Sequence, residues 1–195
     1  MKLYHGTILN HQIDIEKNGI NLEKSKSFLD FGRGFYTTPD FKMAKDMALK
    51  IAKRNKRLNN PFPTVLCFEY TENPQLNYKT FEKEDMEWAK FILSNRLTPE
   101  LGIKLNLTDN NHDLKYDIII GGTADGNIAT IAADLRYEKL QIESFQLDLS
   151  MFLKTDGTSY GTQITFCTQK ALSCIKYVDC DIIYNEKRWL SWEKK

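Results

Sequence analysis

The sequence has few cysteines, and their spacing excludes the usual zinc and disulfide frameworks. Only four of the 195 residues are cysteine, and only three are histidine. No two cysteines form a Cys-x-x-Cys pair, and the histidines are far apart, so we expect no metal site. The cysteines lie at Cys67, Cys167, Cys174 and Cys180. Thiols in this pattern are typical of reduced, mostly buried cysteines in a cytoplasmic protein.

The chain also lacks an excess of charge of one sign and any long apolar run. There are 27 Lys and Arg against 26 Asp and Glu, a net charge of +1, so the chain has no global basic field of a nucleic-acid coat. The longest apolar runs, such as the isoleucines at 118–120, are far shorter than the roughly 18 residues of a membrane span. The first residues show no apolar signal segment. We expect residues 1–195 to form a single domain.

Short strand and helix patterns alternate along the chain. Strand patterns cover residues 35–37, 65–70, 116–120, 163–167 and 176–184, and helix patterns cover residues 10–17, 38–54, 82–95, 124–136, 141–149 and 168–175. In the 38–54 helix, Thr38 is expected to cap the N-terminus, and Met47 is expected to share a core stripe with Ala44, Ala48 and Ile51. Ile13 is expected on the inner face of the 10–17 helix, and residues 21–34 and 97–115 are expected to be loops. The pattern predicts an α+β fold.

Familiar nucleotide-binding and hydrolase motifs are missing. Gly32-Arg33-Gly34 has no third glycine at the dinucleotide-binding spacing, and it follows no clear strand. Neither a phosphate-binding loop with Gly-Lys-Ser/Thr nor a Gly-x-Ser-x-Gly turn occurs. These absences argue against a Rossmann enzyme, a P-loop NTPase and a serine hydrolase.

Five motifs occur in an order that resembles a known superfamily. They are LYHGT at 3–7, DFGRGFYTT at 30–38, EWAKFILSNR at 87–96, YDIIIGGTAD at 116–125 and GTQITFCTQKAL at 161–172. In this order they resemble the ADP-ribosyltransferase superfamily, in its diphtheria-toxin and poly(ADP-ribose)-polymerase branch. More closely, the chain resembles an uncharacterised bacterial family of that clan. The resemblance implies a split β core of two small, mostly antiparallel sheets around an NAD cleft, with peripheral helices.

The resemblance also implies roles for individual residues. His5 aligns with a histidine that holds a ribose hydroxyl of NAD, Tyr36 with an aromatic residue that packs on nicotinamide, and Gln163 with the position of a glutamate. These three are the expected catalytic residues. The residues expected to bind NAD are His5, Gly6, Thr7, Gly32, Arg33, Gly34, Phe35, Tyr36 and Met47. The candidates for an accessory or acceptor role are Asn95, Arg96 and Asp125.

The chemistry of these residue types fits NAD cleavage. Departure of nicotinamide leaves a cationic sugar, so catalysis needs a fixed ribose, a stacked leaving group and a nearby negative group. Tyr36 has a flat face for stacking, and the glycines at 32 and 34 permit close backbone approach. The loop–helix junction near Thr38 is expected to bind an anion, with Arg33 beside the pyrophosphate.

Two residues depart from the superfamily pattern. Gln163 is neutral, so it can hydrogen-bond a hydroxyl but cannot oppose a cation; Asp125 or Glu87 are candidates to compensate. Met47 stands where poly(ADP-ribose)-type enzymes place a second stacking tyrosine, and its thioether contacts a ring more weakly.

Several interpretations stay open. The first is an NAD-dependent mono-ADP-ribosyltransferase or NAD glycohydrolase, whose acceptor would be a protein, a nucleobase or a small molecule. The second is a non-catalytic module that binds NAD or ADP-ribose, and the third is an interaction protein without a nucleotide. Without a ligand, His5, Tyr36 and Gln163 are ordinary structural residues. The basic stripe at residues 42–57 is a solvated face or a weak hint of a nucleic-acid acceptor. The resemblance suggests an intracellular toxin with a neutralising protein partner, and no membrane.

Overall fold

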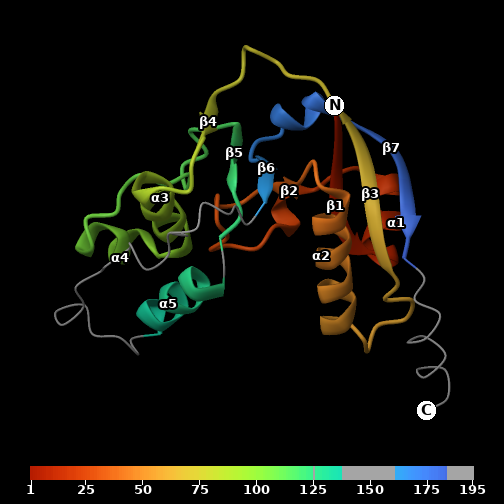
Figure 1. The fold of residues 1–195 in the computed structure, drawn as a ribbon, viewed down its shortest axis with the longest axis horizontal. Coiled ribbons are helices and arrows are strands. Elements are labelled where there is room, and N and C mark those ends of the chain that lie inside the picture. Colours follow the sequence, from red (N-terminus) through yellow and green to blue (C-terminus); the bar gives the residue numbers. More distant parts are fainter. Residues whose placement is uncertain (125, 138–160, 184–195) are drawn as a thin grey trace. The chain divides into compact units, whose positions relative to one another are not determined.

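The computed structural model describes residues 1–124, 126–137 and 161–183 of the chain (Figure 1). The fold is mixed α+β with two small sheets, which confirms the predicted class at that level. The strands are β1 (Lys2–Ile8), β2 (Phe35–Thr37), β3 (Pro63–Tyr70), β4 (Tyr78–Thr80), β5 (Ile118–Gly122), β6 (Thr162–Phe166) and β7 (Ile175–Ile182). The helices are α1 (Leu9–Asn18), α2 (Phe41–Arg54), α3 (Met86–Arg96), α4 (Pro99–Lys104) and α5 (Gly126–Arg136), with 3-10 turns η1 (Leu22–Lys24) and η4 (Ala171–Cys174).

The chain divides into two compact units, and each unit combines segments that are distant in sequence. The first unit consists of Met1–Asn21, Thr37–Glu72 and Cys174–Lys195. The second unit consists of Leu22–Tyr36 and Asn73–Ser173. No helix in the described part of the chain is both long and apolar enough to cross a bilayer.

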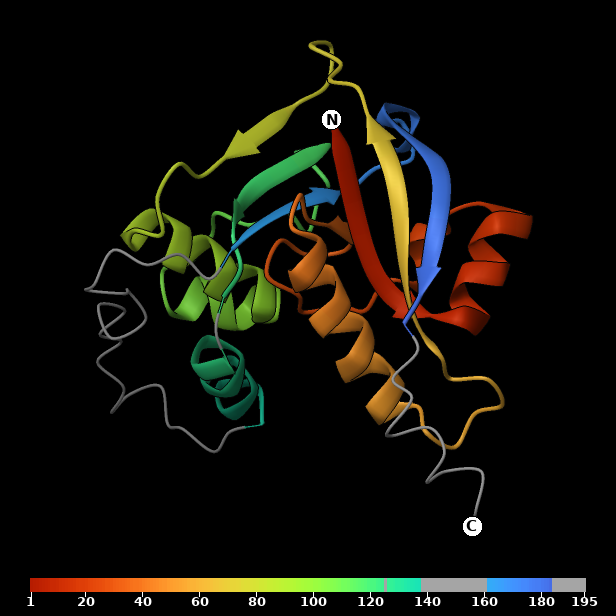
Figure 2. The same cartoon turned by 45° about the vertical axis from the view of Figure 1, so that its right-hand side comes forward.

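The first unit is a three-stranded antiparallel sheet of order β1-β3-β7, with α2 on one face and α1 on the other (Figures 1 and 2). The central strand β3 is buried along most of its length, as its run of β-branched and apolar residues predicts. A side chain at Gly6 would place its Cβ 2.0 Å from the carbonyl oxygen of Ala44. Glycine at this position therefore lets α2 lie directly against β1.

The start of α2 differs from the sequence prediction in its capping residue. The carboxylate of Asp40 caps the helix, because it accepts hydrogen bonds from the backbone N–H groups of Lys42 (2.8 Å) and Met43 (3.3 Å). Thr38 instead accepts a hydrogen bond from the backbone N–H of Asp40 (3.1 Å). Both residue types cap well, and the chain begins the helix two positions later than expected.

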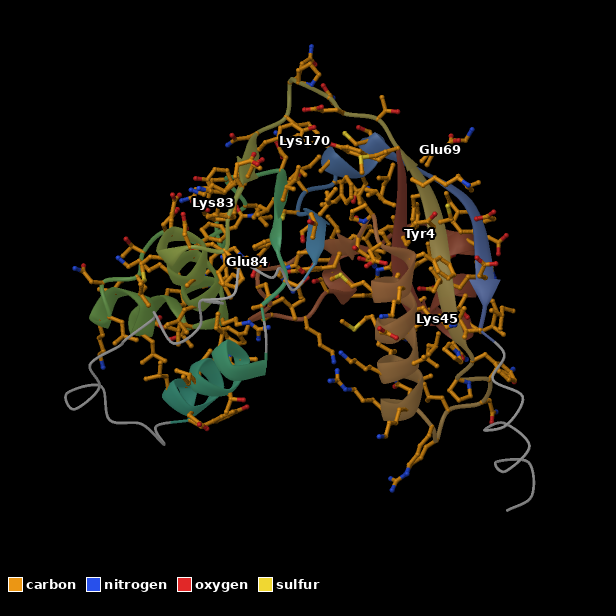
Figure 3. All side chains as sticks on the ribbon, viewed as in Figure 1. Tyr4, Lys45, Glu69, Lys83, Glu84 and Lys170 are labelled. Carbon is orange, nitrogen blue, oxygen red and sulfur yellow. The ribbon has the colours of Figure 1, made fainter. Side chains whose placement is uncertain are left out.

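The core stripe of α2 also differs from the prediction. Ala44, Ala48 and Ala52 are its buried residues, whereas Met47 is 41% exposed. Small side chains occupy the buried face because the helix approaches the sheet so closely at Gly6. The ring of Tyr4, labelled in Figure 3, packs against this alanine face.

The second unit is built on a four-stranded sheet of order β2-β6-β5-β4. Strand β5 pairs antiparallel with β6 and parallel with β4. Its core joins the sheet to α3 and α5 and is rich in aromatic rings: Phe31, Phe81, Trp88 and Phe91, with Tyr36 packed at the edge. Phe31 comes from the loop before β2, Phe81 directly follows β4, and Trp88 and Phe91 lie in α3, so the loop is anchored in the core.

Other predictions had mixed outcomes. Helix α4 lies in a segment that was expected to be loop. The Thr98 hydroxyl caps this helix and Pro99 is its first residue, but the helix is so short that these start signals did not stand out. Strand β4 was not anticipated. Ile13, expected on the inner face of α1, is 54% exposed, and Gln12 is the buried residue of that helix. The helix expected at 168–175 contains only the 3-10 turn η4. The helix expected at 141–149 lies outside the described residues.

Candidate functional site

The candidate residues fall in both units. His5, Gly6, Thr7 and Met47 belong to the first unit. Gly32, Arg33, Gly34, Phe35, Tyr36, Asn95, Arg96 and Gln163 belong to the second unit. Asp125 lies outside the described residues. The geometry is therefore given for each unit in turn.

His5 lies in the middle of β1, half-buried and opposite Leu66 of β3. Because side chains alternate along a strand and Gly6 faces α2, His5 and Thr7 lie on the other face of the sheet. Thr7 is buried, and its hydroxyl is 3.1 Å from the Nδ1 atom of His11. Thr7 therefore has a side-chain partner at the junction of β1 and α1.

The N-terminus of α2 is capped by a carboxylate of the chain itself. Asp40 accepts from the backbone N–H groups of Lys42 and Met43, and it adds negative charge there. An anion would have to compete with Asp40 for these two donors, and the anion site at this junction stays a prediction. Met47, on the same helix, is exposed rather than enclosed in a pocket wall.

Tyr36 and Gln163 lie on neighbouring strands of the second unit, β2 and β6. The Tyr36 hydroxyl donates to the carbonyl of Gly32 (2.7 Å) and accepts from the backbone N–H of Phe31 (3.0 Å). Burial, followed by the negative charge of Asp30, raises the pKa of Tyr36 well above its usual value. Tyr36 is therefore a neutral phenol that closes the 31–32 turn.

Gln163 contacts the same loop from the other strand. Its side-chain Nε2 donates to Asp30 Oδ2 and to the carbonyl of Gly122, each at 3.2 Å. Gln163 is 5% exposed and Asp30 is 6% exposed. The amide of Gln163 thus contacts a buried carboxylate, which the sequence did not predict.

Arg96, at the end of α3, balances the charge of Asp30. Its Nη2 and Nε atoms lie 2.6 and 2.7 Å from Asp30 Oδ1. The backbone N–H of Ala124 donates to the second carboxylate oxygen, Oδ2, at 3.3 Å. Asp30, Arg96, Gln163 and the backbone groups of Gly122 and Ala124 form what we name the Asp30 cluster. It joins the 30–34 loop to α3, to β6 and to the connection between β5 and α5.

The two glycines of the 30–38 motif are required by the local backbone. Gly32 has a φ of +76°, a region that side chains rarely adopt. A Cβ at Gly34 would lie 2.5 Å from the Cγ2 atom of Thr165 on β6. Both glycines therefore shape the loop and its contact with the sheet, whatever ligand the loop binds.

The remaining candidates have structural partners or face solvent. The Arg33 guanidinium is half-exposed and lies 3.5 Å from Glu23. Phe35 is buried in β2. The Asn95 amide donates to the carbonyl of Phe91 (2.9 Å) and accepts from the backbone N–H of Asn111 (2.9 Å), so it holds the segment after α4.

A comparison with protein families assigns the chain to a family but gives no activity. The family model described as "Protein of unknown function (DUF3990)" matches residues 1–177. The chain belongs to this family. No curated protein and no solved structure matches the chain. The description of the family names no activity.

Within this DUF3990 chain, Asp30 is the residue of the candidate site that the sequence did not single out. Glu87, one of the carboxylates expected to compensate for Gln163, is exposed and pairs with Lys79 at 2.6 Å. Asp30 and Gln163 are 133 positions apart, and no spacing rule connects them. The available signal was that Asp30 opens the 30–38 motif, and Arg96 had been named only as an accessory candidate.

Proposed function

We propose that this DUF3990 protein binds NAD and transfers its ADP-ribose group to an acceptor, or to water as an NAD glycohydrolase. In this proposal His5 holds the nicotinamide ribose, Tyr36 lies against the nicotinamide, and Gln163 accepts a hydrogen bond from the sugar. The acceptor of the ADP-ribose group stays open.

One observation carries the proposal: two of the three predicted residues converge on one glycine-rich loop. Tyr36 binds the loop through Phe31 and Gly32, and Gln163 binds it through Asp30. These residues were selected from motifs 127 positions apart in sequence, counted from 36 to 163. A loop held from two strands by a phenol and an amide is a preorganised element of the kind that ligand binding needs.

His5 belongs to the first unit, and the contacts of its neighbours in the chain support its inclusion in the proposed site. Tyr4, the residue before His5, exchanges backbone hydrogen bonds with Thr38, which follows Tyr36 by two residues (2.8 and 2.9 Å). The bridge joins the sequence neighbourhoods of the two motifs. This supports a shared role for LYHGT and DFGRGFYTT.

The reaction proposed is a substitution at the anomeric carbon of the nicotinamide ribose. The bond from that carbon to the nicotinamide nitrogen breaks, and nicotinamide leaves with the electron pair. A nucleophilic oxygen or nitrogen of the acceptor forms the new bond and loses its proton; water in this role gives free ADP-ribose. The site residues fix the sugar and the leaving group, which lowers the entropic part of the barrier.

A second candidate function is binding of NAD or ADP-ribose without turnover. It is favoured by the neutrality of Gln163 together with the ion pair of Asp30 and Arg96, which leaves the cluster without net charge. Removing one preorganised electrostatic group costs about 10²–10³ in rate. Turnover slowed to that degree would leave a binding module.

The test uses the full chain and NAD labelled on the nicotinamide ring. Nicotinamide release is followed with protein, RNA and small-molecule acceptors, and calorimetry measures NAD and ADP-ribose binding. We expect His5→Ala to lower release or binding by at least about tenfold, and His112→Ala, a histidine outside the motifs, to leave both unchanged. Binding without release supports the module. Absence of both in the wild-type protein would rule out the proposed function and the module alike.

A further inference from the structure

Gln163 has only one orientation that its neighbours permit. The two groups within reach of its side-chain nitrogen are the carboxylate of Asp30 and the carbonyl of Gly122, and both are acceptors. Only the NH₂ end of an amide can face two acceptors. The oxygen of Gln163 is therefore turned away from the Asp30 cluster.

That oxygen is not sealed off inside the protein. Among the described residues it accepts no hydrogen bond. The single fully buried side-chain nitrogen or oxygen without a partner, in that same part of the chain, is the Thr165 hydroxyl. The side-chain oxygen of Gln163 therefore keeps some accessible surface, although the residue as a whole is only 5% exposed.

Asp30 also changes the strength of this acceptor. An amide that donates an N–H to a carboxylate is polarised, and its oxygen becomes a better hydrogen-bond acceptor. The charge of Asp30 is in turn balanced by Arg96 at 2.6 Å. A neutral glutamine thus has a carboxylate, paired with an arginine, directly behind it.

We propose that Asp30 is a positioning residue, which fixes and polarises the Gln163 amide so that its oxygen accepts a hydrogen bond from a sugar hydroxyl of the ligand. This inference rests on the proposed function and deepens it. A hydroxyl, as a donor, suits this site, whereas a phosphate or a carbonyl, which brings only acceptors, does not. Asp30 acts through Gln163 and makes no contact with the ligand in this scheme.

The first experiment needs no ligand and uses Gln163→Glu. A glutamate here would bring a carboxylate oxygen against Asp30 and the Gly122 carbonyl, three acceptors without a hydrogen between them. Two adjacent carboxylates repel each other, so we expect the new carboxyl to bind a proton more readily in the folded than in the unfolded protein. Its destabilising effect is therefore present near pH 7 and is relieved as the pH falls towards 5, when the carboxyl gains a donor proton.

The readout is the urea midpoint of Gln163→Glu relative to wild type at each pH. Gln75→Glu, at an exposed glutamine, is the matched control and should follow wild type throughout. A Gln163→Glu protein as stable as wild type at pH 7, with no relief at lower pH, overturns the assigned orientation. Because no NAD is present, this result does not depend on the proposed function.

The second experiment measures the hydroxyl contact with NAD and with analogues that lack the 2′- or 3′-hydroxyl of the nicotinamide ribose. In the wild-type protein one analogue is expected to bind about two- to tenfold more weakly than NAD, the usual range for one hydrogen bond. In Asp30→Asn this ratio should fall towards one, because the charge that polarises the Gln163 amide is removed and the new NH₂ group meets a donor of either Arg96 or Gln163. Asp117→Asn changes a buried carboxylate that does not contact Gln163 and should keep the wild-type ratio.

The outcomes separate the two proposals. An equal hydroxyl ratio in Asp30→Asn and in wild type overturns the positioning role while NAD binding stands. No NAD binding by the wild-type protein overturns the proposed function, and the pH profile of Gln163→Glu still decides the orientation. Should Asp30→Asn not fold, Gln163→Met, which keeps the volume and removes the oxygen, is expected to bring the same ratio to about one.

Discussion

Among its described residues, the second unit has two buried carboxylates that are held in different ways. Asp30 is 6% exposed, and its charge is balanced by the largely buried Arg96. Asp117 is 2% exposed, and it accepts from the Thr168 hydroxyl (2.6 Å), from the backbone N–H of Asn77 (2.9 Å) and from Lys170 (2.9 Å).

The difference separates Asp117, a structural clamp whose donors hold two segments together, from Asp30, which can polarise the neighbouring Gln163 amide. Burial alone would raise the pKa of Asp117, but hydrogen bonds from Asn77, Thr168 and Lys170 outweigh it, so the pKa is lowered from its ordinary value. Its donors tie the segment before β4 to the end of β6. Asp30 has instead one cation on one oxygen and shares the other oxygen between the Gln163 amide and the Ala124 N–H.

The largest expected effect comes from removing the cation of the Asp30 pair. Arg96→Met would leave the carboxylate of Asp30 buried without a counter-charge, and breaking a buried pair in this way costs about 3–5 kcal/mol. The measurement is the unfolding free energy from urea denaturation at pH 7. A loss below about 1 kcal/mol would mean that solvent, not Arg96, balances Asp30.

An intermediate loss of unfolding free energy is expected at Asp117. In Asp117→Asn one of the donors that face the carboxylate meets an NH₂ group, and an unsatisfied buried donor costs about 1–3 kcal/mol. The pH dependence gives a second readout. Because the folded pKa of Asp117 is lowered, its contribution is complete above the ordinary value of 3.8 and is lost as the pH falls below it.

The wild-type advantage over Asp117→Asn should therefore be constant between about pH 5 and 7 and should shrink at lower pH. Unfolding free energies of both proteins from pH 7 down to pH 3 test this. An advantage that grows on acidification would contradict the direction of the shift.

The sequence predicted the local elements better than the partners of polar side chains. Strand β2 was expected at its observed bounds, and helix α3 was expected within a few residues, because alternation and capping signals are encoded locally. The Gly6 contact with α2 and the Asp30–Gln163 contact were not expected. They depend on which segments the tertiary fold brings together, and a single sequence has no local signal for that.

In the candidate site, too, the sequence predicted the residues but not their hydrogen-bond partners. The motifs and the resemblance were enough to select Tyr36 and Gln163, but their hydrogen-bond partners decide what each can offer. The sequence presents Gln163 as a neutral replacement for a glutamate, and the structure adds a carboxylate at Asp30 behind it. Whether His5 acts with them stays a prediction, since motif order alone led to that grouping.

The smallest effect is expected at Lys170, which is the matched contrast to Arg96. The Lys170 side chain, labelled in Figure 3, is 65% exposed, although its ammonium group lies 2.9 Å from Asp117. Solvent screens such a pair, and two neutral donors, the Thr168 hydroxyl and the Asn77 N–H, still bind Asp117. Lys170→Met should therefore cost about 1 kcal/mol or less, and the difference from wild type should narrow further in 1 M salt.

A loss at Lys170 as large as that at Arg96 would show that the two carboxylates depend equally on a cation. The contrast between Asp117 and the Asp30–Arg96 pair would then fail, because Asp117 would no longer be held mainly by neutral donors. If the loss is small at Lys170 and large at Arg96, the ion pair of the Asp30 cluster is the interaction on which the shape of the 30–34 loop depends, and with it the orientation of Gln163.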